Sequence, residues 1–273
     1  MTRQTQELAR LLALRTIRQA DSAILGAYHS RFAGAGLEFA EMADYDGGDA
    51  RAIRWPLSIR KGRLLVSRFQ EEREMPMVFG IDTSSSVLMM QDAWKTVQEI
   101  TALLSACAVH HNDPLGLLLA TAQTEQRTPS GYGIRQMTAI LNRLLELPCH
   151  QTKRTTNLAF LCRRLMDTLQ RRSRIILISD FLNTGYEQPL KALAFKHDVL
   201  ACLIVHNLPS VSSGAELEDC ETGESIIADG STKQTTQETA HLLANAGTQP
   251  VIIQPSCDIH STLLSALRKP RPC

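Results

Sequence analysis

From Met77 onward the chain alternates short, uninterrupted apolar runs with amphipathic helical patterns, and this alternation restricts the fold more than any other feature. Apolar residues at three-and-four spacing predict helices around 94–109, 137–145, 158–169 and 235–246, with a last helix near 261–267. Strands that are apolar on both faces belong to a mostly parallel sheet covered by helices on both sides, so we predict an α/β fold. The runs that read as its buried strands are MVFGI (77–81), LGLLLA (115–120), RIILIS (174–179), VLACLIV (199–205) and VII (251–253).

The first 75 residues have a different character, with scattered glycines, aromatics and arginines and few long apolar runs. We predict an N-terminal extension (1–75) packed on a main domain (76–268), followed by a frayed tail (269–273) that contains two prolines. Phe39, Tyr45 and Trp55 are expected to form the core that docks the extension on the main domain.

Three local features complete the predicted organisation. The segment between Ala120 and Met137 is expected to be a polar loop, and the Thr222-Gly223 pair favours a hairpin between two short β-like segments within 217–227. Arg171, Arg172 and Arg174 flank a buried strand and are expected to be surface charges.

Composition excludes several classes of protein. The formal net charge is +1, from 29 Lys plus Arg and 28 Asp plus Glu, which argues against a main partner that is bulk nucleic acid or an anionic membrane. A DNA binder using the arginines of the N-terminal block is therefore disfavoured, and salt-sensitive DNA retention would be its test. No apolar run is long enough to cross a membrane, and the first twenty residues lack the apolar core of a signal peptide. The seven cysteines form no zinc-binding spacing, so we expect reduced thiols in a cytoplasmic protein.

Polar side chains follow two of the predicted strands, where ligands of such sheets bind. Asp82, Ser84 and Ser86 form an Asp-x-Ser-x-Ser pattern after the first run, and Asp180 follows RIILIS directly. Thr156 stands at the start of a predicted helix. These oxygen ligands suit Mg²⁺, Mn²⁺ or Ca²⁺. Because the hydroxyls are neutral, a bound cation would keep much of its charge and would seek a carboxylate from a partner.

Two other interpretations of the same residues stay open. Ser84, Ser86, Thr156 and Asp180 all belong to residue types that cap helices, a role compatible with metal binding. An Asp after a buried strand is also typical of Mg²⁺-dependent phosphatases of the haloacid dehalogenase type, with Asp82 as the phosphoryl nucleophile. Such enzymes usually carry a second Asp where this chain has Ser84. No P-loop, nucleophile elbow or His-Glu-x-x-His motif occurs.

The pentad of Asp82, Ser84, Ser86, Thr156 and Asp180 resembles the metal-ion-dependent adhesion site of von Willebrand factor A-type domains. Together with five upstream blocks, the chain resembles the family called domain of unknown function 58. Those blocks are GAYHS (26–30), GAGLEF (34–39), YDGGD (45–49), RAIRW (51–55) and FQEER (69–73).

The resemblance implies a von Willebrand factor A-like, Rossmann-type sheet whose pentad holds Mg²⁺, Mn²⁺ or Ca²⁺. It also implies a bacterial or archaeal cytoplasmic interaction module that is not an enzyme. Its partners would be a MoxR-type AAA+ ATPase, for which it would act as adaptor or co-chaperone in protein assembly or maturation, and a client protein that presents an acidic residue.

Overall fold

A computed structural model describes residues 3–32, 39–45, 47, 53–69, 75–121, 125–147, 157–205, 216–218, 225–227, 232–255 and 257–269. Its centre is a six-stranded sheet in the order β10-β7-β6-β3-β4-β5, in which every pairing is parallel except that of β5 with β4. The predicted mostly parallel α/β sheet is thereby confirmed. The strands are β3 (Met77–Asp82), β4 (Leu115–Ala120), β5 (Glu125–Gly131), β6 (Arg174–Ser179), β7 (Asp198–Ile204) and β10 (Gln249–Ile253).

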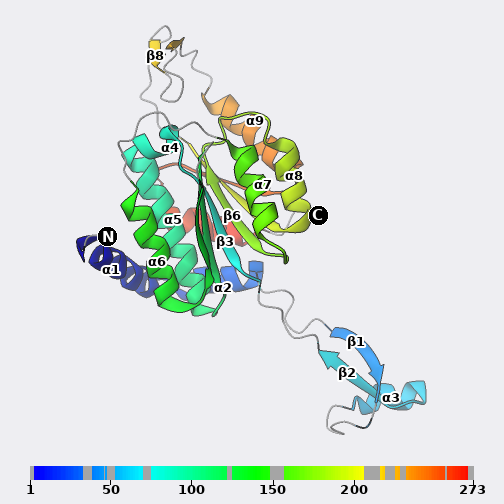
Figure 1. Ribbon diagram of the computed structural model, residues 1–273. Helices are drawn as coiled ribbons and strands as arrows, with labels where there is room; N and C mark the ends of the chain where they lie inside the picture. Colours follow the sequence, from blue (N-terminus) through cyan, green and yellow to red (C-terminus); the bar gives the residue numbers. More distant parts are fainter. Residues whose placement is uncertain are drawn as a thin grey trace.

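Helices cover both faces of this sheet (Figure 1). On one face lie α4 (Ser85–Met89), α5 (Gln91–His110), α6 (Gly133–Glu146) and α10 (Ile259–Leu267), with α1 (Arg3–Gln19) and α2 (Ser22–Phe32) packed against them. On the other face lie α7 (Leu158–Thr168), α8 (Glu187–Lys196) and α9 (Thr232–Asn245).

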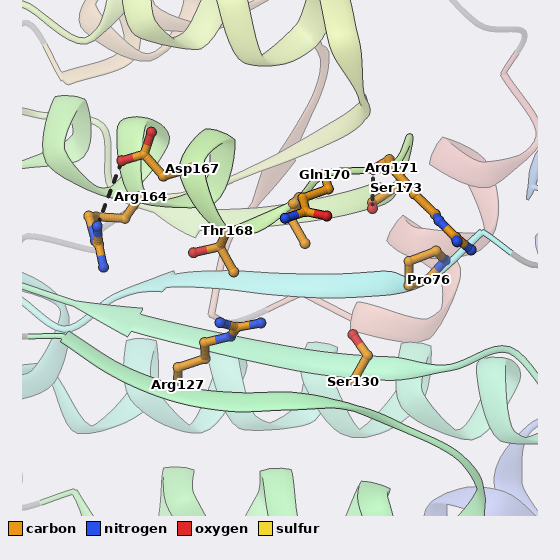
Figure 2. A pocket seen from close by; sticks show the side chains of 10 residues that line it. Pro76, Arg127, Ser130, Arg164, Asp167, Thr168, Gln170, Arg171 and Ser173 are labelled. Carbon is orange, nitrogen blue, oxygen red and sulfur yellow. Dashed lines mark hydrogen bonds and ion pairs between the residues drawn. The ribbon is translucent and has the colours of Figure 1, made fainter.

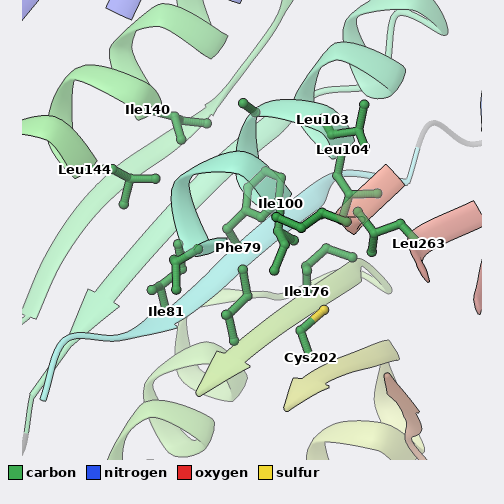
Figure 3. Packing of buried hydrophobic residues seen from close by; sticks show 14 of the residues in the cluster. Phe79, Ile81, Ile100, Leu103, Leu104, Ile140, Leu144, Ile176, Cys202 and Leu263 are labelled. Atoms are coloured by element: carbon green, nitrogen blue, oxygen red, sulfur yellow. The ribbon is translucent and has the colours of Figure 1, made fainter. Parts of the chain in front are cut away.

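Alternation along the strands divides the core into two layers. Phe79, Ile81 and Ile176 point toward α5 and pack with Ile100 and Leu104 (Figure 3). The intervening residues of the same strands point toward α7 and α8 and form the second layer. Both faces of each central strand are therefore apolar, which is why these strands read as continuous hydrophobic runs.

The edge strand β5 corrects the expectation of a polar loop after Ala120. Its sequence, EQRTPSG, has no apolar residue, and its side chains are exposed or half-buried. A strand that pairs on one side only and faces solvent gives no hydrophobic signal, and Pro129 is tolerated because β5 lies at the edge of the sheet. In contrast, the predicted hairpin is present: β8 (Glu216–Glu218) pairs antiparallel with β9 (Ser225–Ile227).

Two buried polar clusters attach α2 to the amino end of the sheet. Arg31 donates to both carboxylate oxygens of Asp198 at 3.2 Å and to Gln249 Oε1 at 2.9 Å. Tyr28 Oη and Arg174 Nη1 both donate to Asp113 Oδ2, at 2.8 and 2.7 Å. The expectation that Arg174 is a surface charge is therefore wrong, because this guanidinium is buried against Asp113.

The rest of the N-terminal region forms a small separate unit of β1 (Phe39–Asp44), β2 (Leu65–Phe69) and α3 (Trp55–Lys61), which projects away from the sheet in Figure 1. Trp55 was expected in a docking core, but its residue is 57% exposed, so that expectation is wrong. The side chain of Phe39 and the tail from residue 270 lie outside the described part of the chain.

Cys107, Cys162 and Cys202 are buried free thiols, in line with the reduced state that the sequence predicted.

Candidate metal centre

The predicted site lies where the direction of the sheet connections reverses. From β3 the chain moves outward to β4 and β5 on one side, then returns to β6 and moves outward on the other side. In open α/β sheets this reversal leaves a crevice at the carboxyl ends of the two central strands. Asp82 is the last residue of β3, and Asp180 directly follows β6, which pairs with β3 in parallel register. The topology thus brings both predicted carboxylates to this crevice.

Ser84 and Ser86 join Asp82 in the loop and first helical turn after β3. The backbone N–H of Ser84 donates to Asp82 Oδ1 at 3.0 Å, and its hydroxyl lies 3.1 Å from Asp82 Oδ2 and 3.0 Å from Ser86 Oγ. Ser84 is the N-cap residue of α4, but its side chain makes no capping hydrogen bond. The hydroxyl instead lies between Asp82 Oδ2 and Ser86 Oγ, so it does not cap α4.

Ser179 is a site residue that sequence reasoning missed. It is fully buried at the end of β6, and its hydroxyl lies 3.0 Å from Asp82 Oδ2 and 3.5 Å from Asp180 Oδ1. It also accepts from the backbone N–H of Phe181 at 3.1 Å. Phe181 has a left-handed backbone (φ 54°) that non-glycine residues seldom adopt, and its buried ring packs edge-on against Tyr186. The sequence feature that could have identified Ser179 is its position as the last residue of the apolar run of β6, immediately before Asp180.

The carboxylates of Asp82 and Asp180 are both buried, and their like charges interact. Asp82 and Asp180 are 2% and 3% exposed. Burial, and after it the negative charge of Asp180, raises the pKa of Asp82 from 3.8 to about 7, against the opposing hydrogen bonds from Ser179 and Ser84. Two negative charges buried close together disfavour each other's ionisation, and a cation placed beside them would stabilise the ionised form of both groups.

The donor set fits a hard divalent cation. The site presents carboxylate and hydroxyl oxygens, which Mg²⁺, Mn²⁺ and Ca²⁺ prefer. Within the described ranges no group of three or more His, Cys, Asp or Glu side chains is placed to hold a metal. Thr156 lies outside the described residues; the next residue, Asn157, caps α7 by accepting from the N–H of Phe160 at 2.8 Å.

A pocket of about 610 Å³ lies elsewhere, between α7 and β5, toward the amino ends of β3 and β6 (Figure 2). Its lining includes Arg127, Arg164 and Arg171. Arg164 pairs with Glu125 and Asp167, so part of the positive charge here is already compensated within the chain. The pocket brings together none of the predicted site residues.

Comparison with known families agrees with this architecture. A family model described as "Protein of unknown function DUF58" matches residues 41–248. The protein belongs to the DUF58 family. This DUF58 protein has a mostly parallel α/β sheet flanked by helices, and the two Bacteroides structures below share that fold.

Two solved structures from Bacteroides share the fold of this DUF58 protein. BatB from Bacteroides thetaiotaomicron is 15% identical, with a TM-score of 0.50 over 71% of this chain and 96% of that chain. An aerotolerance-related membrane protein from Bacteroides fragilis is 13% identical, with a TM-score of 0.50 over 70% and 96%. The VWA domain of SpRpn10 is 16% identical, with a TM-score of 0.44 over 70% and 93%.

Two negative findings accompany these likenesses. A search of curated proteins gave no significant match to this DUF58 chain. In the part of the chain that the structure describes, none of the helices combines the length and the apolar character needed to span a membrane.

Proposed function

We propose that this protein is a divalent-metal-dependent protein–protein interaction module. Mg²⁺, or Mn²⁺ or Ca²⁺ in its place, would be held by Ser84 and Ser86, with Thr156 as a further ligand. Asp82 and Asp180 would orient the hydroxyls and bind metal-bound water. The supporting observation is the convergence of two buried carboxylates and two serine hydroxyls at the carboxyl ends of β3 and β6.

The chemistry of the ligands explains why such a site would bind a partner. Neutral hydroxyl ligands leave most of the cation's charge uncompensated, so an open coordination position favours an anionic oxygen from outside. Ser84 is fully buried, whereas Ser86 is half-buried and marks the side of the site that is nearer to solvent. An Asp or Glu side chain of a client protein supplies the kind of oxygen required.

Nothing in the geometry favours the alternative of a haloacid dehalogenase-type phosphatase. Asp82 is buried, and its carboxylate accepts hydrogen bonds from the N–H and hydroxyl of Ser84 and from the hydroxyl of Ser179. The position two residues after Asp82, where such enzymes usually carry a second Asp, is Ser84. We therefore propose a binding role without catalysis, and hydrolysis of p-nitrophenyl phosphate that is lost in Asp82→Asn would contradict it.

The proposed cellular partner is a MoxR-type AAA+ ATPase, for which the protein would act as adaptor or co-chaperone while the metal site engages the client. This part of the proposal depends on the family resemblance, and so does a cytoplasmic location. Its test is direct binding of the full chain to a purified MoxR-type ATPase, with and without Mg²⁺.

The experiment for the metal site is calorimetric titration of Mg²⁺ and Mn²⁺ into chelator-treated protein. We expect one ion per chain in the wild type and in the control Ser265→Ala, an exposed helical serine far along the chain. We expect no binding in Ser84→Ala/Ser86→Ala, whose unfolding midpoint in chelator should stay close to that of the wild type. Binding that is unchanged in the double variant would refute the assignment. If the wild type alone gives no heat, the titration is repeated with acetate as a carboxylate donor, and failure there also refutes it.

A further inference from the structure

Three histidines gather where the end of α5 meets α2. His110 is the last residue of α5 and His111 is its C-cap, whereas His29 belongs to α2. The ring of His111 is the central one, with its centroid 5.2 Å from that of His29 and 5.2 Å from that of His110. In Figure 1, α2 lies at the opposite end of the sheet from α4 and the candidate metal centre. Because histidine changes its charge near neutral pH, three imidazoles in contact form an arrangement that is sensitive to acid.

His111 makes two further contacts that connect α5 to α2. Its Nε2 lies 3.3 Å from the carbonyl oxygen of Leu25, and because a carbonyl can only accept, His111 donates with this nitrogen. Its ring also stacks on that of Tyr28, with centroids 5.3 Å apart and 14° between the planes. His111 is half-buried among these partners, whereas His29 and His110 are exposed. The ring of His111 is therefore part of the contact that docks α2.

The docked position favours the neutral form of this ring. Burial lowers the pKa of His111 from 6.5, and the charges of His29 and His110 lower it further. The hydrogen bond to Leu25 and the charge of Asp113 act in the opposite direction but are outweighed. A group whose pKa is lower when α2 is docked binds its proton more readily when α2 is undocked. The contribution of His111 to docking is therefore complete above pH 6.5 and is lost as the pH falls below that value.

One carboxylate beside the cluster opposes the effect of acid. Asp113 attracts a protonated His111, but it already accepts hydrogen bonds from Tyr28 Oη at 2.8 Å and from Arg174 Nη1 at 2.7 Å. Because the guanidinium of Arg174 already compensates its charge, Asp113 does not balance three further positive rings.

Two ion pairs hold α2 at its ends. Near the C-terminal end Arg31 is buried against Asp198, so this end of the helix stays on the sheet when the histidines are charged. At the N-terminal end Asp21 lies 3.5 Å from His260 of α10, and acid strengthens this pair, but both side chains are partly exposed and such pairs are worth little. The effect of acid is therefore concentrated in the middle of α2, around residues 25–29.

We propose that His29, His110 and His111 form a pH-sensitive clasp, which holds the middle of α2 on the end of α5 at neutral pH and loosens it in acid. When the rings are neutral, they stack and His111 donates to α2. When they are protonated, the central ring carries a positive charge about 5 Å from two others. The chain leaves the main body for the projecting unit of β1, β2 and α3 after α2, so the clasp acts on the helix at which this unit is attached.

The test is hydrogen exchange of the full chain at pH 7.5 and pH 5.5 in low salt, followed by mass spectrometry and corrected for the intrinsic effect of pH. We expect the protection of residues 22–32 to fall in acid in the wild type and in the control His241→Gln, which changes an exposed histidine of α9. The fall should be at least about fourfold smaller in His29→Gln and in His111→Gln, the factor that two unit charges about 5 Å apart give even in bulk water. Glutamine is uncharged, and at position 111 it can still donate to Leu25.

Three results would overturn the proposal. The first is an equal fall in protection in the wild type and in the variants; if His111→Gln does not fold, His29→Gln decides, because that side chain is exposed. The second is an NMR titration of the ring protons in which His111 takes up its proton at or above pH 6.5. The third is a difference between wild type and variants that appears only with Mg²⁺, which would assign the effect to the metal centre instead.

Discussion

Gly80 of β3 offers a sharp test of how the sheet and α7 are packed. A Cβ atom added at this position would lie 2.8 Å from Leu165 Cδ1 of α7 and 3.3 Å from Leu177 Cδ1 of β6. Both leucines are fully buried, so neither methyl group can move aside without disturbing its neighbours. Overpacking of this kind costs about 1–3 kcal/mol, more than the few tenths to about 1 kcal/mol that Gly→Ala gains through the unfolded chain. We expect Gly80→Ala to lower the free energy of unfolding by about 1–2 kcal/mol.

Urea denaturation of a double-mutant cycle measures this contact. Leu165→Ala alone should cost about 2–5 kcal/mol because it leaves a cavity. In that background Gly80→Ala should cost less than about 0.5 kcal/mol, since the clashing methyl group is gone. The matched control is Gly26→Ala in α2, where an added Cβ meets nothing within 4 Å and where alanine should stabilise the helix by about 0.5–1 kcal/mol.

Additive effects of the two substitutions would refute this reasoning. If Gly80→Ala costs the same with and without Leu165, the close approach of α7 to β3 is not what selects glycine.

The result also bears on the metal centre, because α7 begins immediately after its cap, Asn157, next to Thr156. A shift of α7 should therefore weaken Mg²⁺ binding in Gly80→Ala, and calorimetry under the conditions above would measure the change.

Three further predictions concern single buried groups. Ser179→Ala should lower Mg²⁺ affinity about 10–100-fold in calorimetry, because its hydroxyl orients Asp82; an unchanged affinity would remove Ser179 from the site. Arg31→Ala should cost about 3–5 kcal/mol in urea denaturation, since it leaves Asp198 buried without its guanidinium, whereas a cost below about 1 kcal/mol would show that this ion pair does not hold α2. Burial lowers the pKa of His197 from 6.5 to about 4, so the unfolded chain binds this proton first, and the contribution of His197 to stability should fall by about 2 kcal/mol between pH 7.5 and pH 5; the raised pKa of Asp82 acts in the opposite direction. The difference in stability between the wild type and His197→Asn should therefore change by about 2 kcal/mol over this range, and a constant difference would contradict the assignment.

The sequence was sufficient to predict those elements whose burial leaves a clear pattern of apolar residues. The four long apolar runs became β3, β4, β6 and β7, because strands covered on both faces need apolar residues at every position. Asp82 and Asp180 could be placed in one crevice without coordinates, since parallel strands end at the same edge. The hydroxyls of Ser84 and Ser86 followed from their spacing after Asp82.

Features that depend on pairing across long distances could not be predicted. The sequence around Arg174 does not indicate its partner Asp113, and the sequence around Arg31 does not indicate its partner Asp198. Each guanidinium is buried because the fold brings a carboxylate from a distant part of the chain into contact with it. Ser179 was missed for a related reason, since its role is to bridge two carboxylates on different strands. In β5 and α3 the side chains face solvent, so no hydrophobic period existed to find.

Buried carboxylates have different partners at the two ends of the sheet, and this difference supports the proposal of a cation at the carboxyl end. At the amino end, Asp198 and Asp113 each accept from a buried guanidinium. At the carboxyl end, Asp82 is faced by serine hydroxyls, a backbone N–H and the like charge of Asp180. A buried charge requires compensation, and hydrogen bonds from neutral groups supply only part of it. Chelator should therefore leave the ion pairs at the amino end unaffected, while added Mg²⁺ should raise the unfolding midpoint of the wild type and not that of Ser84→Ala/Ser86→Ala.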